Sequence, residues 1–216
     1  MSPVSQTLEK TPGTAGPLGG SGDWGRPGPG GDGALPLGAT PPSASRIGVW
    51  LLVGAITILF VAFTSTYLVR RAQSDWRIGP LPPVLWVNTA LLVASGLVLE
   101  RARRGARVDA PRVWRGALAT ATVLGIAFVA GQIAVWTQLA AAGIFMASNP
   151  HAAFFYLLTG VHGLHVAGGV CALLYTQWKT WRLDGRAALD VIEPTATYWH
   201  FVDGLWIYLF VILFWI

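Results

Sequence analysis

Residues 154–169 read FFYLLTGVHGLHVAGG, an apolar run that contains two histidines three positions apart. Such a run within a longer uncharged stretch predicts a membrane-spanning helix. A second polar motif, YWHFVD, opens the last apolar stretch of the chain and places His200 and Asp203 three positions apart. Because ionisable side chains are costly to bury in lipid, both this pair and the pair of His162 and His165 are expected to face protein or a polar cavity.

The composition assigns the chain to a class before any motif is considered. Hydrophobic residues make up 53% of the 216 residues and charged residues 12%, and the mean hydropathy is +0.53. A soluble domain of this size needs more polar surface, so the sequence indicates an integral membrane protein. The single cysteine, Cys171, excludes a disulfide within the chain and a cysteine-based metal site, and we expect it to be a buried core thiol.

Two regions of the chain differ in composition. Residues 1–45 hold eleven glycines and eight prolines and little that could form a core, so they are expected to be a flexible tail. Residues 46–216 contain five apolar segments that are long enough, or nearly so, to cross about 30 Å of hydrocarbon. The expected fold is therefore all-α, a bundle of five transmembrane helices. The segments are residues 47–69, 83–99, 113–139, 153–178 and 197–216, with Pro194 just ahead of the last.

Lysine and arginine are distributed unevenly between the two sides of this bundle. Five crossings place the tail and the loops at residues 100–115 and 178–195 on one side, together with twelve of the fifteen basic residues. The other side holds Arg70, Arg71 and Arg77. Because basic residues accumulate in cytoplasmic loops, the N-terminus is predicted to be cytoplasmic and the C-terminus periplasmic.

The run at residues 154–169 has two faces when it is drawn as a helix. The histidines lie on one face and need polar partners. The opposite face carries a stripe of small residues, which should allow a neighbouring helix to approach closely. The stripe consists of Gly160, Gly163, Ala167 and Cys171.

The histidines also raise the question of a haem or metal site, since histidine is a common ligand of both. Two histidines three positions apart on one helix cannot supply the two opposite axial ligands of one haem, so each would need a partner on another helix. Hydrogen bonding at helix contacts is the other interpretation of His162, His165 and His200, and we favour it. On that interpretation we expect no cofactor-binding or metal-binding residue. We also expect no catalytic residue, because no nucleophile and base are arranged for catalysis.

The sequence around both motifs resembles the two signature segments of subunit III of the haem-copper terminal oxidases, in the five-helix bacterial form of that family. The segments are YLLTGVHGLHV at residues 156–166 and YWHFVDGLW at residues 198–206. The resemblance covers about residues 46–216. Further similar stretches are GVWL at 48–51, NTALL at 88–92 and GQ at 131–132.

The resemblance implies an accessory role in a respiratory complex that reduces O2 to water and pumps protons. Haem and copper would lie in the partner catalytic subunits, and the chain would belong to an oxidoreductase complex without holding catalytic residues. It would pack on subunit I, with subunit II and possibly a subunit IV in the complex, hold phospholipid, and support sustained turnover and proton uptake. The implied location is the bacterial inner membrane, and no nucleic-acid partner is expected.

The resemblance carries over some residues and not others. The family commonly has intramembrane acids where this chain has Ile56 and Val135, so a proton-collecting or lipid-gating role of those carboxylates is not expected. Lys179 stands where the family often has an arginine on a phospholipid headgroup, although a lysine there can also simply extend to the interface. Lipid contacts are expected from Lys179, Arg182, His162 and His165. Structural polar roles within the membrane are expected from His200, Asp203, Gln132, Asn88 and Glu193, of which Glu193 matches a family acid.

Two other functions stay open at this point. A subunit III-like protein could serve a nitric oxide reductase, and a membrane cytochrome could hold haem through His162, His165 or His200. The sequence also leaves open whether cytochrome c or quinol donates the electrons, which haem type the complex uses, and whether it joins a supercomplex.

Overall fold

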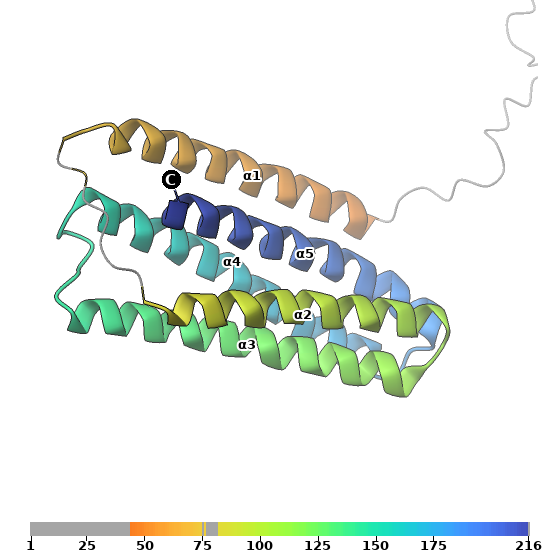
Figure 1. The fold of residues 1–216 in the computed structure, drawn as a ribbon. Coiled ribbons are helices and arrows are strands. Elements are labelled where there is room, and N and C mark those ends of the chain that lie inside the picture. The colour runs from red at the N-terminus through yellow and green to blue at the C-terminus, as the bar shows by residue number, and fades with distance from the viewer. Residues whose placement is uncertain (1–43, 75, 77–81, 216) are drawn as a thin grey trace, which may run out of the picture. The chain divides into compact units, whose positions relative to one another are not determined.

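The computed structural model describes residues 44–74, 76 and 82–215. In this part of the chain there are five α-helices, each long and apolar enough to cross a membrane. Successive helices run in opposite directions along one bundle (Figure 1). They are α1 (Ala44–Arg71), α2 (Val84–Arg107), α3 (Pro111–Ala141), α4 (Pro150–Thr180) and α5 (Gly185–Trp215).

This architecture confirms the expected all-α fold with five helices able to span a membrane. The tail expected at residues 1–45 falls outside the described residues except for Ala44 and Ser45, which begin α1. The starts of α1, α3 and α5 and the ends of α2 and α4 lie at one end of the bundle (Figure 1). We call this the arginine-rich end, because most of the arginines of the described residues lie there.

The helices extend well beyond the apolar segments that predicted them. Helix α2 continues through the charged sequence ERARRGAR, and α5 begins twelve residues ahead of its apolar segment. The loops expected at residues 100–115 and 178–195 therefore shrink to residues 108–110 and 181–184. Arginine, alanine and glutamate favour helix, so charge alone does not end a helix that reaches the headgroup region. Pro194 lies inside α5, and the prediction that it precedes the last helix is wrong.

Two polar side chains fix helix ends. Asn149 caps α4, because its Oδ1 accepts a hydrogen bond from the Ala152 backbone N–H at 2.8 Å. Asp109, in the turn between α2 and α3 with a φ of 49°, accepts one from the Gly185 N–H at 2.8 Å. A Cβ at position 185 would lie 2.6 Å from the Ala106 carbonyl oxygen, so only glycine fits there. The α2–α3 turn is thereby joined to the start of α5.

Helices α2, α3, α4 and α5 form a closed ring in which each packs on two neighbours, and α1 lies against α4 and α5 (Figure 1). In the most apolar 18-residue stretch of α5, 56% is buried inside the bundle, whereas the corresponding share for α1 is 17%. The largest side chains of the interior are Trp114, Trp199 and Trp206, each at 1% exposure. Helix α5 is therefore the centre of the bundle, and most of the surface of α1 is left for lipid or another chain.

Close helix approach occurs at other glycines than the sequence suggested. The Trp199 ring lies against Gly125 and Gly169, where an added Cβ would come within 2.6 and 2.9 Å of it. Gly160 has no atom within 4 Å of the corresponding position, and Cys171 is exposed. The prediction of a buried thiol is wrong, and the predicted packing stripe is wrong at Gly160 and Cys171, because α4 turns the face with His162 inward. Of the stripe, Gly163 does approach a neighbouring helix, with a Cβ there 3.9 Å from the Trp136 ring of α3.

Replacing Gly169 by leucine should therefore weaken the bundle, since the Trp199 ring leaves no room for a side chain. Overpacking of this kind costs about 1–3 kcal/mol. The matched control is Gly160→Leu on the same helix, where the space is open and little effect is expected. The temperature of aggregation of each purified variant in detergent measures the difference. Equal losses in the two variants would contradict the packing described here.

Candidate functional site

His162 lies at the centre of the helical ring. Its side chain is 0% exposed and contacts the rings of Phe128 and Trp206, with centroid separations of 6.0 and 5.0 Å. The Trp206 Nε1–H donates to the Thr89 hydroxyl of α2 at 2.9 Å. Neither ring nitrogen of His162 has a hydrogen-bond partner among the described residues. The histidine therefore joins α3, α4 and α5 through ring contacts.

His165, one turn further along α4, faces different neighbours. Its Nδ1 lies 2.7 Å from the carbonyl oxygen of Val161 on its own helix, and its ring contacts Phe60 of α1 at 5.8 Å. Its backbone carbonyl accepts a hydrogen bond from the Tyr198 hydroxyl at 3.0 Å. The two histidines of the motif thus serve two contacts, one inside the ring and one toward α1.

His200 and Asp203 face α2. Asp203 is 8% exposed, and its carboxyl lies against Gly96, in the space that a Cβ of residue 96 would fill. The His200 Nδ1 is 3.4 Å from the same point, and its Nε2 lies 3.9 Å from a carboxylate oxygen of Glu100. A glycine of α2 therefore makes the room for this pair. The structural role expected of His200 and Asp203 stays a prediction.

Asn88 and Gln132 belong to the α2–α3 contact and are 1% and 2% exposed. The Asn88 amide lies against Gly131 of α3, again in the space that a Cβ would fill. The Asn88 Nδ2 and both amide atoms of Gln132 lack a hydrogen-bond partner among the residues that the structure describes. Nearby on the same contact, the Ser95 hydroxyl donates to the Ala121 carbonyl oxygen at 2.8 Å. The structural role expected of both amides stays a prediction.

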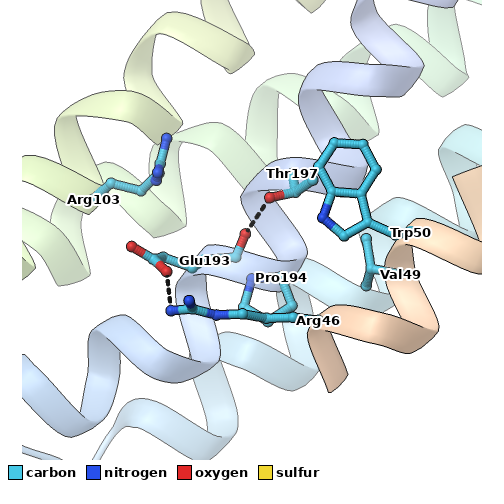
Figure 2. A pocket seen from close by; sticks show the side chains of 7 residues that line it. All are labelled: Arg46, Val49, Trp50, Arg103, Glu193, Pro194 and Thr197. Atoms are coloured by element: carbon cyan, nitrogen blue, oxygen red, sulfur yellow. Dashed lines mark hydrogen bonds and ion pairs between the residues drawn. The ribbon is translucent and has the colours of Figure 1, made fainter. Parts of the chain in front are cut away.

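Glu193 lies at the arginine-rich end and joins three helices. It forms an ion pair with Arg46 of α1, and Arg107 of α2 lies 3.8 Å from its other carboxylate oxygen. Figure 2 shows Arg46 and Glu193 joined at the wall of a small cavity that Arg103 also lines. Its partner on α1 lies 147 residues away in the sequence.

Lys179 and Arg182 are exposed at the end of α4. Together with Trp178 and Trp181 they line a hollow of about 470 Å³. The Lys179 ammonium nitrogen lies 5.7 Å from the centre of the Tyr175 ring. The interior position of His162 leaves it no surface to offer a lipid, so the structure does not bring all four expected lipid contacts together.

Two further expectations concern the positions of the family acids and the absence of a metal site. Ile56 and Val135 are 3% and 0% exposed and belong to the apolar core. Within the described ranges, no group of three or more His, Cys, Asp or Glu side chains is placed to hold a metal ion.

The sequence analysis did not single out three residues that make contacts between helices, namely Arg46, Thr89 and Gly96. Only Gly96 gave a signal, as a small residue on a helix that carries buried polar groups.

Known proteins are similar to this chain over nearly all of its helical part. A family model described as "Cytochrome c oxidase subunit III" matches residues 45–216. The cytochrome c oxidase subunit 3 of Synechocystis sp. is 30% identical over 184 residues, which cover 80% of this chain and 76% of the relative. A probable cytochrome c oxidase subunit 3 of Mycobacterium tuberculosis is 29% identical, with 81% and 89% covered. The subunit 3 of Bacillus sp. (strain PS3) is 26% identical, with 78% and 84% covered.

The fold and these contacts define a class of polytopic membrane protein in which internal polar side chains join helices to one another. Within that class, the match over residues 45–216 is decisive. The chain belongs to the cytochrome c oxidase subunit III family. Its relatives are subunits of a membrane-bound oxidoreductase complex.

The contact of Asp203 with Gly96 predicts a specific coupling between two substitutions. Gly96→Ala should destabilise the protein, because the new methyl group collides with the carboxyl group; the expected cost is about 1–3 kcal/mol. In an Asp203→Ala background the same change should cost much less, since the colliding group is gone.

Thermal aggregation of the single and double variants in detergent measures this coupling. Gly116→Ala, at a glycine with no atom within 4 Å of the added methyl, is the control. An equal cost of Gly96→Ala in both backgrounds would show that Asp203 does not occupy this space.

Proposed function

We propose that this chain is a non-catalytic accessory subunit of a proton-pumping haem-copper oxidase that reduces O2 to water. The observation that carries the proposal is the family match over all of the helices. The site is consistent with it, since His162, His165 and Asp203 are engaged with rings, backbone and glycine at helix contacts. Haem and copper would lie in partner subunits, and this chain would stabilise the assembly.

Its partners in this proposal are the catalytic subunit I, subunit II and possibly a subunit IV. The weakly covered surface of α1 supports docking to another membrane chain, because apolar residues such as Trp50, Leu51 and Ile58 are 65%, 71% and 73% exposed. In a bilayer such a surface is covered either by lipid or by a neighbouring helix.

Phospholipid binding is the second element of the proposal. Lys179 and Arg182 offer two cations beside two tryptophans at the end of α4, an arrangement suited to a phosphate headgroup at the membrane interface. The buried Ile56 and Val135 offer no carboxylate within the membrane. Support of proton uptake would therefore come from packing and lipid retention.

We further propose that the protein lies in the bacterial inner membrane with its arginine-rich end in the cytoplasm. That end carries arginines on α1, α2, α3 and α5 and both cations of the α4 end, whereas Arg70 and Arg71 lie at the opposite end of α1. Basic residues accumulate on the cytoplasmic side because they resist translocation.

Cysteine labelling tests this orientation in a Cys171→Ser background. Ala147→Cys, in the loop between α3 and α4, should react with an impermeant maleimide added to intact spheroplasts. Arg107→Cys, at the arginine-rich end, should react only after the membrane is permeabilised. Both positions are exposed, so access to reagent decides the result. The reverse pattern would overturn the orientation.

Depletion of the chain tests the accessory role. Complexes that lack it should catalyse their first turnovers at a rate close to that of the intact complex and then lose activity progressively, because the chemistry lies elsewhere and only support is lost. Oxygen consumption over many turnovers measures this, with intact complex taken through the same detergent steps as the control. Loss of the very first turnovers, or unchanged longevity, would contradict the proposal.

A further inference from the structure

Helix α1 is packed on the ring along one half of its length. Its buried residues are Ile56, Phe60, Thr64 and Tyr67, which all lie in the second half. In the first half, residues 44–55, every side chain is exposed or half-buried. Packing on α4 and α5 therefore holds the second half of the helix, and the first half projects past this packing toward the arginine-rich end.

Two hollows lie between α1 and α5. A cavity of about 170 Å³ at the arginine-rich end is lined by Arg46, Trp50 and Glu193, among others (Figure 2). Further along, an open groove of about 430 Å³ is lined by Thr57 of α1 and Gly204 of α5, among others. Atoms that border unfilled space make no dispersion contacts across it, so packing resists a small tilt of α1 only weakly.

Arg46 joins the first half of α1 to the ring by charge. Its guanidinium forms an ion pair with Glu193 of α5, and the two side chains are 46% and 21% exposed. An ion pair that water reaches contributes little to stability and is screened by salt. The contact can therefore open at a small cost in free energy.

Glu193 has a second partner, which belongs to the ring and does not move with α1. Arg107 of α2 lies 3.8 Å from the other carboxylate oxygen, and Arg103 of α2 lines the same cavity. When Arg46 leaves, the carboxylate stays paired within the ring and no uncompensated charge is left behind. Because the two cations at Glu193 repel each other, Arg107 also weakens the hold of Glu193 on Arg46.

We propose that α1 is a lever that opens and closes on the ring at the arginine-rich end. The Arg46–Glu193 ion pair is its latch, and the packed half from Ile56 to Tyr67 is its pivot. In the closed position the exposed face of α1 stands at a fixed angle to the ring, and opening changes the angle at which that face meets a neighbouring chain. The inference goes beyond the proposed function, and its test needs no partner.

Distances between two spin labels test the lever in the full-length chain, carrying Cys171→Ser, in nanodiscs of phosphatidylcholine. Gly48→Cys on α1 and Gly116→Cys on α3 report the arginine-rich end, at glycines where an added Cβ meets no atom within 4 Å. Val69→Cys and Thr137→Cys, both exposed, report the opposite end of the same two helices. Double electron–electron resonance gives the distance distribution of each pair.

Raising the salt concentration from about 0.05 to 1 M should add a longer distance at the arginine-rich end, because screening weakens the latch. A tilt of roughly 20° over the 12 residues from Gly48 to Phe60 moves the helix end by about 6 Å. The distance between Val69→Cys and Thr137→Cys should stay the same. This measurement keeps the natural latch, so it decides the question even where a latch variant fails to fold.

Substitutions at the two arginines should act in opposite directions. Arg46→Gln should produce the longer distance at low salt, because the latch is lost. Arg107→Gln should lower the share of the longer distance about two-fold, since Glu193 then serves Arg46 without a competing cation. The matched control is Arg101→Gln, which removes an arginine of the same helix end that lines a different hollow, between α2 and α3.

Three results would overturn the lever. One is a single distance at the arginine-rich end at every salt concentration, which would show a rigid α1. Another is an equal shift at both ends, which would show that the whole helix moves. The third is that Arg107→Gln acts in the same direction as Arg46→Gln, or that Arg101→Gln acts as Arg107→Gln does. Copurification with an oxidase is scored separately, so failure of the lever and failure of the proposed function are distinguishable.

Discussion

The hydrocarbon core of a bilayer holds no water, so polar side chains at that depth must be shielded from lipid by protein. This constraint shapes the bundle. In this chain, glycines on the facing helices make room for the polar side chains. Asp203 lies against Gly96, and the Asn88 amide lies against Gly131. The indole of Trp199 uses two glycines of α3 and α4 in the same way. Because each large or polar group fits only where the facing helix has no side chain, these contacts fix the heights at which α5 packs on its neighbours and α2 packs on α3.

The fold was largely predictable from the sequence, because a membrane helix is marked by its length and apolarity alone. The helix ends were not, since the charged ends of α2 and α5 continue as helix and Pro194 is accommodated within α5. The family was also recognisable, because its two motifs are local in the sequence. The partners of His200 and Asp203 were not, because spacing along one helix shows which side chains share a face and not which helix lies opposite. Cys171 was misjudged for the same reason.

The two ends of α1 are held by different physical means. At the arginine-rich end the attraction is electrostatic, between Arg46 and Glu193, and it lies where water and salt can reach it. At the other end Tyr67 is 0% exposed and its hydroxyl donates to the Ile212 carbonyl oxygen at 3.5 Å. At this end the helix is thus held by aromatic packing. Its charged end is the more sensitive to ionic strength.

The separation of 147 residues between Arg46 and Glu193 also has a consequence for biosynthesis. At roughly 5–20 residues per second, about 7–30 s pass between translation of the arginine and of its partner. For most of that interval neither α4 nor α5, the helices on which α1 packs, has been made. Helix α1 can span the membrane alone in the meantime, because its backbone hydrogen bonds are internal. Helix α1 therefore reaches its final packing only after α5 has been made, and the rate of translation sets that delay.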